Sequence, residues 1–176
     1  MKIGLVGTVS VGKTTLVNAL KELPQFKDYH FATERSKYLR DLGIPLNTDS
    51  TLKGQTMFLA ERVSELMQDN LITDRTIIDI MAFTNASKSI KEADKVSFEE
   101  YARNFIKEYD YIFYVTPLGV EIEDNGVRET NAEYRDLIDF TIQRLLNIYP
   151  HRINSLHTIS GSTEERIKQI MEVISL

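Results

Sequence analysis

The amino-acid sequence contains no cysteine among its 176 residues, so the chain forms no disulfide bond and offers no thiolate ligand to zinc. A chain without cysteine suits a reducing compartment, and we expect a cytoplasmic protein. No apolar run approaches the ~20 residues that a transmembrane helix requires, so no association with a membrane is expected. The apolar stretch at residues 1–7 is short and leads directly into a loop motif, which argues against a secretory signal peptide.

Repeats, low-complexity segments and linkers rich in glycine, serine or proline are also missing. Hydrophobic residues make up 42% of the chain and charged residues 27%, which are ordinary values for a globular protein. We therefore expect one domain over residues 1–176. The formal net charge of −5 disfavours a protein whose main function is to bind nucleic acid, but it does not exclude a local basic groove.

Short apolar runs alternate with helical patterns along the chain. Strands are predicted at residues 2–6, 29–33, 70–74, 111–115 and 155–159. Helices are predicted at residues 13–23, 34–42, 51–68, 97–108 and 132–147. A last helix begins near Ser162, whose spacing to Glu165 is typical of a capping box. This alternation predicts an α/β fold with a parallel sheet covered on both faces, where ligands bind at the carboxyl ends of the strands.

Residues 7–14 match the phosphate-loop motif G-x-x-x-x-G-K-[ST], with an apolar strand before it and a helix after it. Backbone N–H groups of such a loop surround anionic oxygens, and the helix N-terminus adds partial positive charge. Lys13 is expected to reach the β- and γ-phosphates of a nucleotide, and the Thr14 hydroxyl to ligate Mg²⁺. The nucleotide-binding residues predicted here are Gly7, Val9, Ser10, Val11, Gly12, Lys13, Thr14 and Thr15.

A carboxylate followed by an arginine ends each of two predicted strands: Glu34 with Arg35, and Asp74 with Arg75. Phosphoryl transfer uses such groups, because a carboxylate can accept a hydroxyl proton or orient a metal, and an arginine can stabilise the charge on the transferred group. We predict catalytic roles for Glu34, Asp74 and Arg75, a metal-binding role for Asp74, and substrate contacts for Glu34, Arg35 and Arg75. The alternative is that the acids cap helices and the arginines face solvent.

Two further positions are candidates for binding the substrate or the nucleotide. Gln55 lies on the apolar stripe of the 51–68 helix, where a nucleobase edge would satisfy its amide; the alternative is an exposed, fraying first turn. The turn at Gly161 and Ser162 follows the last predicted strand and would let the backbone approach a base ring, or would simply connect the strand to the helix.

The polar segment at about 117–131 is a candidate lid that closes over the phosphates and excludes water. Arg128 lies near its end and is predicted to contact phosphate as a catalytic residue; the alternative is an idle surface arginine.

Taken in order, these segments resemble the P-loop kinases and ATPases typified by the ribosylnicotinamide kinase domain of the bacterial NAD-biosynthesis regulator, and more distantly the deoxynucleoside and thymidylate kinases. The shared features are the 7–15 loop, Glu34 followed by Arg35 and Arg40, Thr73-Asp74-Arg75 followed by Asp79, the 124–128 segment, and Gly161-Ser162 followed by Glu165 and Arg166.

The resemblance implies a three-layer P-loop NTPase fold with a five-stranded sheet in the order 2-3-1-4-5. It also implies that Glu34 contacts the acceptor hydroxyl as the general-base candidate, and that Asp74 and Arg75 serve metal and phosphates. The Gly161 loop would then pack on adenine.

The leading functional hypothesis is an ATP- and Mg²⁺-dependent kinase that transfers the γ-phosphate to a hydroxyl or phosphate of a nucleoside, nucleotide or related metabolite. One alternative is a kinase acting on hydroxymethylated pyrimidine in DNA, as in phage DNA modification. The other is a nucleotide-gated ATPase or switch without a small-molecule acceptor. The sequence lacks the Asn-Lys-x-Asp motif expected of a GTPase, which favours ATP over GTP. Either a monomer or a homodimer is compatible with this pattern.

Overall fold

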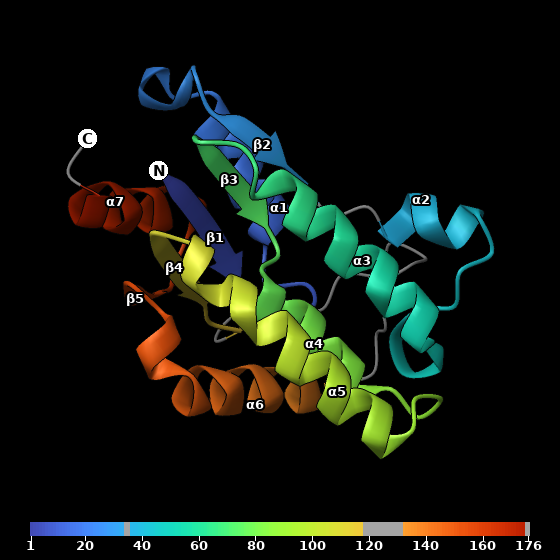
Figure 1. Ribbon diagram of the computed structural model, residues 1–176. Helices are drawn as coiled ribbons and strands as arrows, with labels where there is room; N and C mark the ends of the chain where they lie inside the picture. Colours follow the sequence, from blue (N-terminus) through green and yellow to red (C-terminus); the bar gives the residue numbers. More distant parts are fainter. Residues whose placement is uncertain (34–35, 118–131, 175–176) are drawn as a thin grey trace.

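The protein forms a parallel five-stranded sheet with helices on both faces, as seen in a computed structural model that describes residues 1–33, 36–117 and 132–174 (Figure 1). The strand order is β2-β3-β1-β4-β5, as predicted, and every pairing is parallel. The strands are β1 (Lys2–Val6), β2 (His30–Ala32), β3 (Leu71–Asp74), β4 (Tyr111–Val115) and β5 (Leu156–Ile159). Each lies within one residue of its predicted bounds, because short buried apolar runs between turns are strong strand signals.

Strand register brings the loops that carry chemistry to one edge of the sheet. Leu5 of β1 pairs with Asp74 of β3, and Val6 pairs with Tyr114 of β4. The loop that begins at Gly7 and the turn at Arg75 therefore leave neighbouring strands at the same level, at their carboxyl ends.

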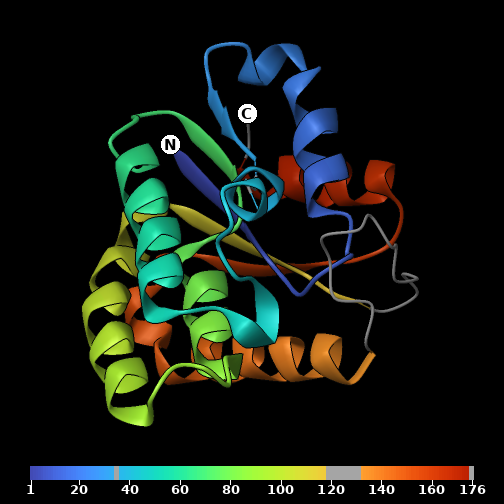
Figure 2. The same ribbon diagram turned by 90° about the vertical axis from the view of Figure 1, so that its right-hand side faces the viewer.

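The helices are α1 (Lys13–Lys21), α2 (Ser36–Asp41), α3 (Leu52–Glu65), α4 (Ile77–Ala86), α5 (Glu92–Ala102), α6 (Ala132–Ile148) and α7 (Thr163–Ile174). Short 3₁₀ turns occupy Pro24–Phe26, Asn47–Asp49, Arg103–Glu108 and Pro150–Arg152. Helices α1 and α7 cover one face of the sheet, and α3, α4, α5 and α6 cover the other (Figures 1 and 2). In the part of the chain that the structure describes, no helix combines the length and apolar character needed to cross a membrane.

Each face of the sheet carries its own apolar core. On the first face, Leu16 and Leu20 of α1 pack with Ile170 of α7 over the strands. On the second face, α4 and α6 supply fully buried residues such as Ile77 and Ile138. Burial of this apolar surface is the main favourable contribution to folding and fixes the helices that frame the edge of the sheet.

Helix α4 was not predicted from the sequence. Nine of its ten residues are buried, so its sequence is apolar on all sides and shows no 3.6-residue alternation of polar and apolar positions.

Several predicted helices differ in their bounds; α3, for example, ends at Glu65, three residues before the predicted end of the 51–68 helix. The helix predicted at 97–108 instead begins at Glu92, where acidic residues in the first turn favour a helix start, and changes to a 3₁₀ turn at Arg103. Helix α1 ends at Lys21, two residues before the predicted end, because Leu23 is extended ahead of Pro24.

Candidate active site

The loop between β1 and α1 depends on two glycines at positions where a side chain would not fit. Gly12 caps α1 with a φ of 83°, a left-handed conformation that glycine adopts readily. Gly7 packs so closely on β4 that a Cβ atom there would lie 2.7 Å from the carbonyl oxygen of Val115. The two glycines thus let the chain turn sharply from the strand into the helix, as the phosphate-loop motif predicts.

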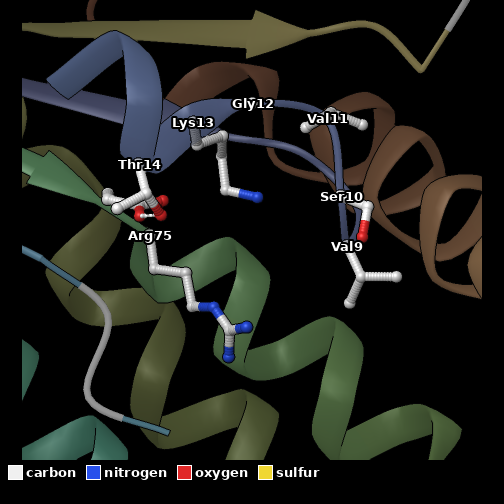
Figure 3. Close-up of a pocket in the computed structure, with 8 residues that line it drawn as sticks. Val9, Ser10, Val11, Gly12, Lys13, Thr14 and Arg75 are labelled. Carbon is white, nitrogen blue, oxygen red and sulfur yellow. Dashed lines mark hydrogen bonds between the residues drawn. The ribbon is translucent and has the colours of Figure 1, made fainter. Parts of the chain in front are cut away.

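One cavity at this edge of the sheet joins the loop to the end of β3 (Figure 3). Its lining residues are Val9, Ser10, Val11, Gly12, Lys13, Thr14, Asp74 and Arg75. The Lys13 side chain turns back across the loop, with its Nζ atom 2.6 Å from the Gly7 carbonyl oxygen and 2.9 Å from that of Thr8. Only 7% of Lys13 is exposed, so its ammonium charge is concentrated in a site that is poorly screened by water.

Thr14 and Asp74 meet across the cavity, where the Thr14 hydroxyl donates a hydrogen bond to Asp74 Oδ2. Asp74 is the last residue of β3 and is buried. A hydroxyl and a carboxylate are hard oxygen donors of the kind that Mg²⁺ prefers. Among the residues that the structure describes, no group of three or more acidic or histidine side chains could hold a metal ion alone. This pair therefore fits an ion that takes its other ligands from phosphates and water.

Arg75 follows β3 with a φ of 129°, a conformation that L-residues rarely adopt. Its guanidinium carbon lies 4.4 Å from the centroid of the Phe83 ring of α4, at a distance typical of a cation–π contact. Figure 3 shows the side chains of Lys13 and Arg75 extending into the space between the loop and α4. Strained backbone of this kind costs about 1–3 kcal/mol and is concentrated at functional sites.

A buried carboxylate from α4 contacts the start of the loop. Asp79 Oδ1 accepts a hydrogen bond from the Gly7 backbone N–H at 3.1 Å, and Asp79 Oδ2 accepts one from the Thr76 N–H at 2.7 Å. Burial raises the pKa of Asp79, although nearby Lys13, the two N–H groups and Arg75 act in the opposite direction. From the sequence, Asp79 appeared only among the residues that carry the family resemblance, with no role predicted for it. The spacing of Thr76 and Asp79 could have indicated the helix cap, but not the contact with Gly7.

Helices α7 and α6 also contact the loop, at Val11 and at Thr8 respectively. The Arg166 guanidinium donates to the Val11 carbonyl oxygen at 2.7 Å, and only 4% of Arg166 is exposed. Burial lowers the pKa of Arg166. The Thr8 hydroxyl donates to the backbone oxygen of Arg135 in α6 at 2.8 Å. Arg166 was not predicted as a site residue, because on the sequence it is one charged residue in the first turn of an amphipathic helix.

Gln55 is buried on the inner side of α3, with 4% of its surface exposed. The interpretation of an exposed, fraying first turn is therefore wrong. Further along α3, Arg62 donates to the Thr73 hydroxyl at 2.8 Å, which fixes this helix against the end of β3. Gln55 precedes Arg62 by two turns, so it lies about 10 Å farther along the helix axis, beyond the carboxyl edge of the sheet. Within the described ranges, its side-chain amide makes no hydrogen bond.

Gly161 and Ser162 form the turn between β5 and α7, where Gly161 has a φ of 90°. The predicted capping box is present: the Ser162 N–H donates to Glu165 Oε2 at 2.7 Å, and the Glu165 N–H donates to Ser162 Oγ at 3.2 Å. Hydrogen bonds from the backbone and the side chain of Ser162 to the Glu165 carboxylate lower the pKa of Glu165. The turn does not line the cavity of Figure 3, but the contact of Arg166 with Val11 places the start of α7 beside the phosphate loop.

Of the remaining predicted site residues, Thr15 is exposed on α1. Glu34, Arg35 and Arg128 lie outside the described residues, as does the proposed lid beyond Pro117. The structure therefore brings together the phosphate loop, Asp74 and Arg75, and places Gln55 on the same side of the sheet.

A parallel sheet of order 2-3-1-4-5 with a G-x4-G-K-T loop between β1 and α1 defines the class of P-loop nucleoside-triphosphate-binding proteins. Within this class, the model of the AAA domain family AAA_28 matches residues 2–166, and the chain belongs to that family. No curated protein sequence matches the chain.

Solved structures agree with this assignment of the fold. Deoxyadenosine kinase from M. mycoides with bound dATP is similar with a TM-score of 0.66 at 17% identity, covering 100% of both chains. The NadR protein in complex with NR is similar with a TM-score of 0.75 at 16% identity, over 99% of this chain and 51% of that chain. The chain thus spans about half the length of NadR. The predicted resemblance and fold class are both confirmed.

Proposed function

We propose that this protein is an ATP- and Mg²⁺-dependent kinase that transfers the γ-phosphate to a hydroxyl or phosphate of a nucleoside, nucleotide or related small metabolite. The observation that carries the proposal is the cavity that Lys13 and the phosphate loop share with the Asp74–Arg75 pair. Nucleotide binding alone needs the loop. An additional arginine, held in a strained conformation opposite the loop, supplies charge where a transferred phosphoryl group passes to its acceptor.

In this proposal the loop N–H groups and Lys13 bind the β- and γ-phosphates of ATP. The Thr14 hydroxyl and the Asp74 carboxylate hold Mg²⁺, which neutralises charge on the phosphates when it is bound. The turn at Gly161 and Ser162 packs beside the adenine base. Lys13 is already oriented by the carbonyl groups of Gly7 and Thr8, so little rearrangement is needed to exchange these partners for phosphate oxygens.

On the acceptor side, Arg75 stabilises the transferred phosphoryl group, and Gln55 hydrogen-bonds the acceptor. The Gln55 side chain is largely buried and its amide makes no hydrogen bond to the described part of the protein, so a ligand would supply its partner. Glu34 is the proposed general base, Arg35 a substrate contact and Arg128 a lid residue that contacts phosphate. The named ligands of the similar structures, dATP in deoxyadenosine kinase and NR in NadR, support an acceptor of nucleoside-like size.

The two alternatives differ in their support. A switch or ATPase without an acceptor is compatible with membership of an AAA domain family and stays a second candidate. A DNA-directed kinase has less in its favour. The lysines that could contact DNA are Lys88, Lys91 and Lys95, and Lys95 pairs with Glu92 in α5 at 2.7 Å. That pairing is typical of a solvated helix face.

The test is ATP turnover with Mg²⁺ against a panel of nucleosides, mononucleotides, ribosylnicotinamide and hydroxymethyluracil-containing DNA, with products identified by mass. Turnover that one small acceptor stimulates, and that Lys13→Ala abolishes, is the expected result. Slow hydrolysis that is equal for all acceptors would refute the kinase proposal and favour the ATPase reading. Phosphorylated DNA as the only product would favour the DNA-directed alternative.

A further inference from the structure

Asp79 occupies an unusual position for a helix-capping residue, because its two carboxylate oxygens contact two different parts of the site. Oδ2 accepts from the backbone N–H and the hydroxyl of Thr76, at 2.7 and 2.9 Å, and so caps α4. Oδ1 accepts from the N–H of Gly7, the first residue of the phosphate loop, at 3.1 Å. The cap needs only the first of these oxygens.

The two partners of Asp79 belong to the two sides of the cavity. Gly7 begins the segment that carries Lys13 and Thr14, and Thr76 directly follows the segment that carries Asp74 and Arg75. Since Gly7 and Arg75 directly follow the adjacent strands β1 and β3, the carboxylate bridges the two segments where they leave the sheet. This contact joins the first residue of the phosphate loop to the residue after Arg75. It therefore fixes the distance between the cavity-lining groups of the two segments.

Stability alone does not account for a carboxylate in this place. Asp79 is fully buried, and burial raises its pKa because the charged form is disfavoured away from water. The neighbouring charges that act in the opposite direction are Lys13 and Arg75, both of which line the cavity. The buried carboxylate thus contacts the loop and is electrostatically coupled to the two cations of the site.

We propose that Asp79 is a positioning residue that sets the phosphate loop against the Asp74–Arg75 turn through its bridge between Gly7 and Thr76. The inference rests on the nucleotide-binding part of the proposed function and not on the identity of the acceptor. Asp79 touches no phosphate in this account. It acts by satisfying the Gly7 N–H, which has no alternative acceptor among the hydrogen bonds of the described residues.

The test measures binding of a fluorescent ATP analogue, in the presence of Mg²⁺ and without any acceptor, together with the unfolding temperature. Asp79→Asn keeps the size of the side chain, but its NH₂ group must face one of the two N–H donors. We expect the Kd for the analogue to rise about tenfold, because a buried N–H loses its acceptor. Failure of the kinase proposal would leave this result unchanged, since no phosphoryl transfer is measured.

Two matched variants separate positioning from stability. Thr76→Val removes the capping hydroxyl but leaves the Gly7 contact, and should change the Kd by less than about twofold while lowering the unfolding temperature. Asp139→Asn alters another buried carboxylate, which is bonded to Tyr114 and Gln143 of β4 and α6, and should also leave the Kd within about twofold.

The proposal is overturned if Asp79→Asn binds the analogue as tightly as Thr76→Val does. It is also overturned if the Kd values of the three variants simply follow their unfolding temperatures. Should Asp79→Asn fail to fold, Asp79→Glu takes its place under the same criterion, because its carboxylate is displaced by one methylene group from both N–H donors.

Discussion

The two sides of the cavity are built differently. On the phosphate side, the loop is fixed by close packing of Gly7 on β4 and by side chains from α4 and α7. On the side proposed to bind the acceptor, Arg75 has a strained backbone and packs on the Phe83 ring, and Gln55, which lies beyond the cavity lining, makes no side-chain hydrogen bond within the described ranges. The phosphate side is therefore held by several elements before any ligand binds, whereas on the other side the Gln55 amide is left for a ligand to satisfy.

This difference predicts how changes on each side should act. A change on the phosphate side disturbs a preorganised site and should weaken ATP binding whatever the acceptor is. A change on the acceptor side removes single contacts and should alter the KM for the acceptor while ATP binding is preserved. Substitutions on each side therefore test whether ATP binding and acceptor binding depend on separate groups.

The largest effect is expected for Lys13→Ala on the phosphate side. Loss of the ammonium group from a buried site should reduce turnover by about 10³-fold, because charge stabilisation is strongest where water is excluded. The measurement is steady-state ADP formation, with Lys21→Ala in the exposed end of α1 as the control. Turnover within about tenfold of the wild type would contradict the role of Lys13.

Asp74→Asn should have the second largest effect, a loss of turnover of about 10²-fold, while the protein stays folded. The amide oxygen can still accept the Thr14 hydrogen bond, but the negative charge that would attract Mg²⁺ is lost. Turnover measured over a series of Mg²⁺ concentrations should show a raised requirement for the ion. Asp69→Asn, at an exposed position, is the control, and an unchanged Mg²⁺ dependence in Asp74→Asn would argue against a metal role.

Arg166→Lys tests the far end of the loop. The compact ammonium group of lysine cannot reproduce the planar guanidinium that donates to the Val11 carbonyl oxygen. We therefore expect the Kd for ATP to rise about tenfold. The KM for the acceptor should not change, which a two-substrate kinetic analysis would measure. Lys168→Ala is the control on the same helix. An equal change in both constants would show that the two sides are not separable at this position.

The smallest effect on turnover is expected for Gln55→Leu on the acceptor side. It should raise the KM for the acceptor about tenfold and leave the Kd for ATP unchanged, because a buried polar contact to the ligand is lost. Thermal unfolding should show equal or greater stability, since a largely buried side chain whose amide makes no hydrogen bond to the described residues is replaced by an apolar one. Marked destabilisation would indicate that Gln55 has a structural role instead.

The same contrast explains how much of the molecule could be predicted from the sequence. The phosphate loop is local: eight consecutive residues, with a strand before and a helix after, specify its conformation. The strands were predicted because buried parallel strands leave continuous apolar runs, whereas their order came from the family resemblance. Helix α4 was missed for a related reason, because full burial removes the periodicity by which helices are recognised.

The roles of Asp79 and Arg166, which hold the phosphate loop, could not be predicted, because they depend on tertiary contacts. The Asp79–Gly7 contact joins residues 72 positions apart, and the Arg166–Val11 contact joins residues 155 positions apart. Nothing in the local pattern around Asp79 distinguishes a carboxylate that only caps α4 from one that also holds the loop. Similarly, the burial of Gln55 was settled only by the packing of α3 on the sheet.

The most direct test of the central claim is the ratio of ADP formed to phosphorylated acceptor formed, measured by mass in the same reaction with Mg²⁺-ATP and the acceptor that best stimulates turnover. A kinase with separate phosphate and acceptor sides predicts one phosphorylated acceptor for each ADP. Accumulation of ADP and free phosphate with no phosphorylated acceptor would contradict the account.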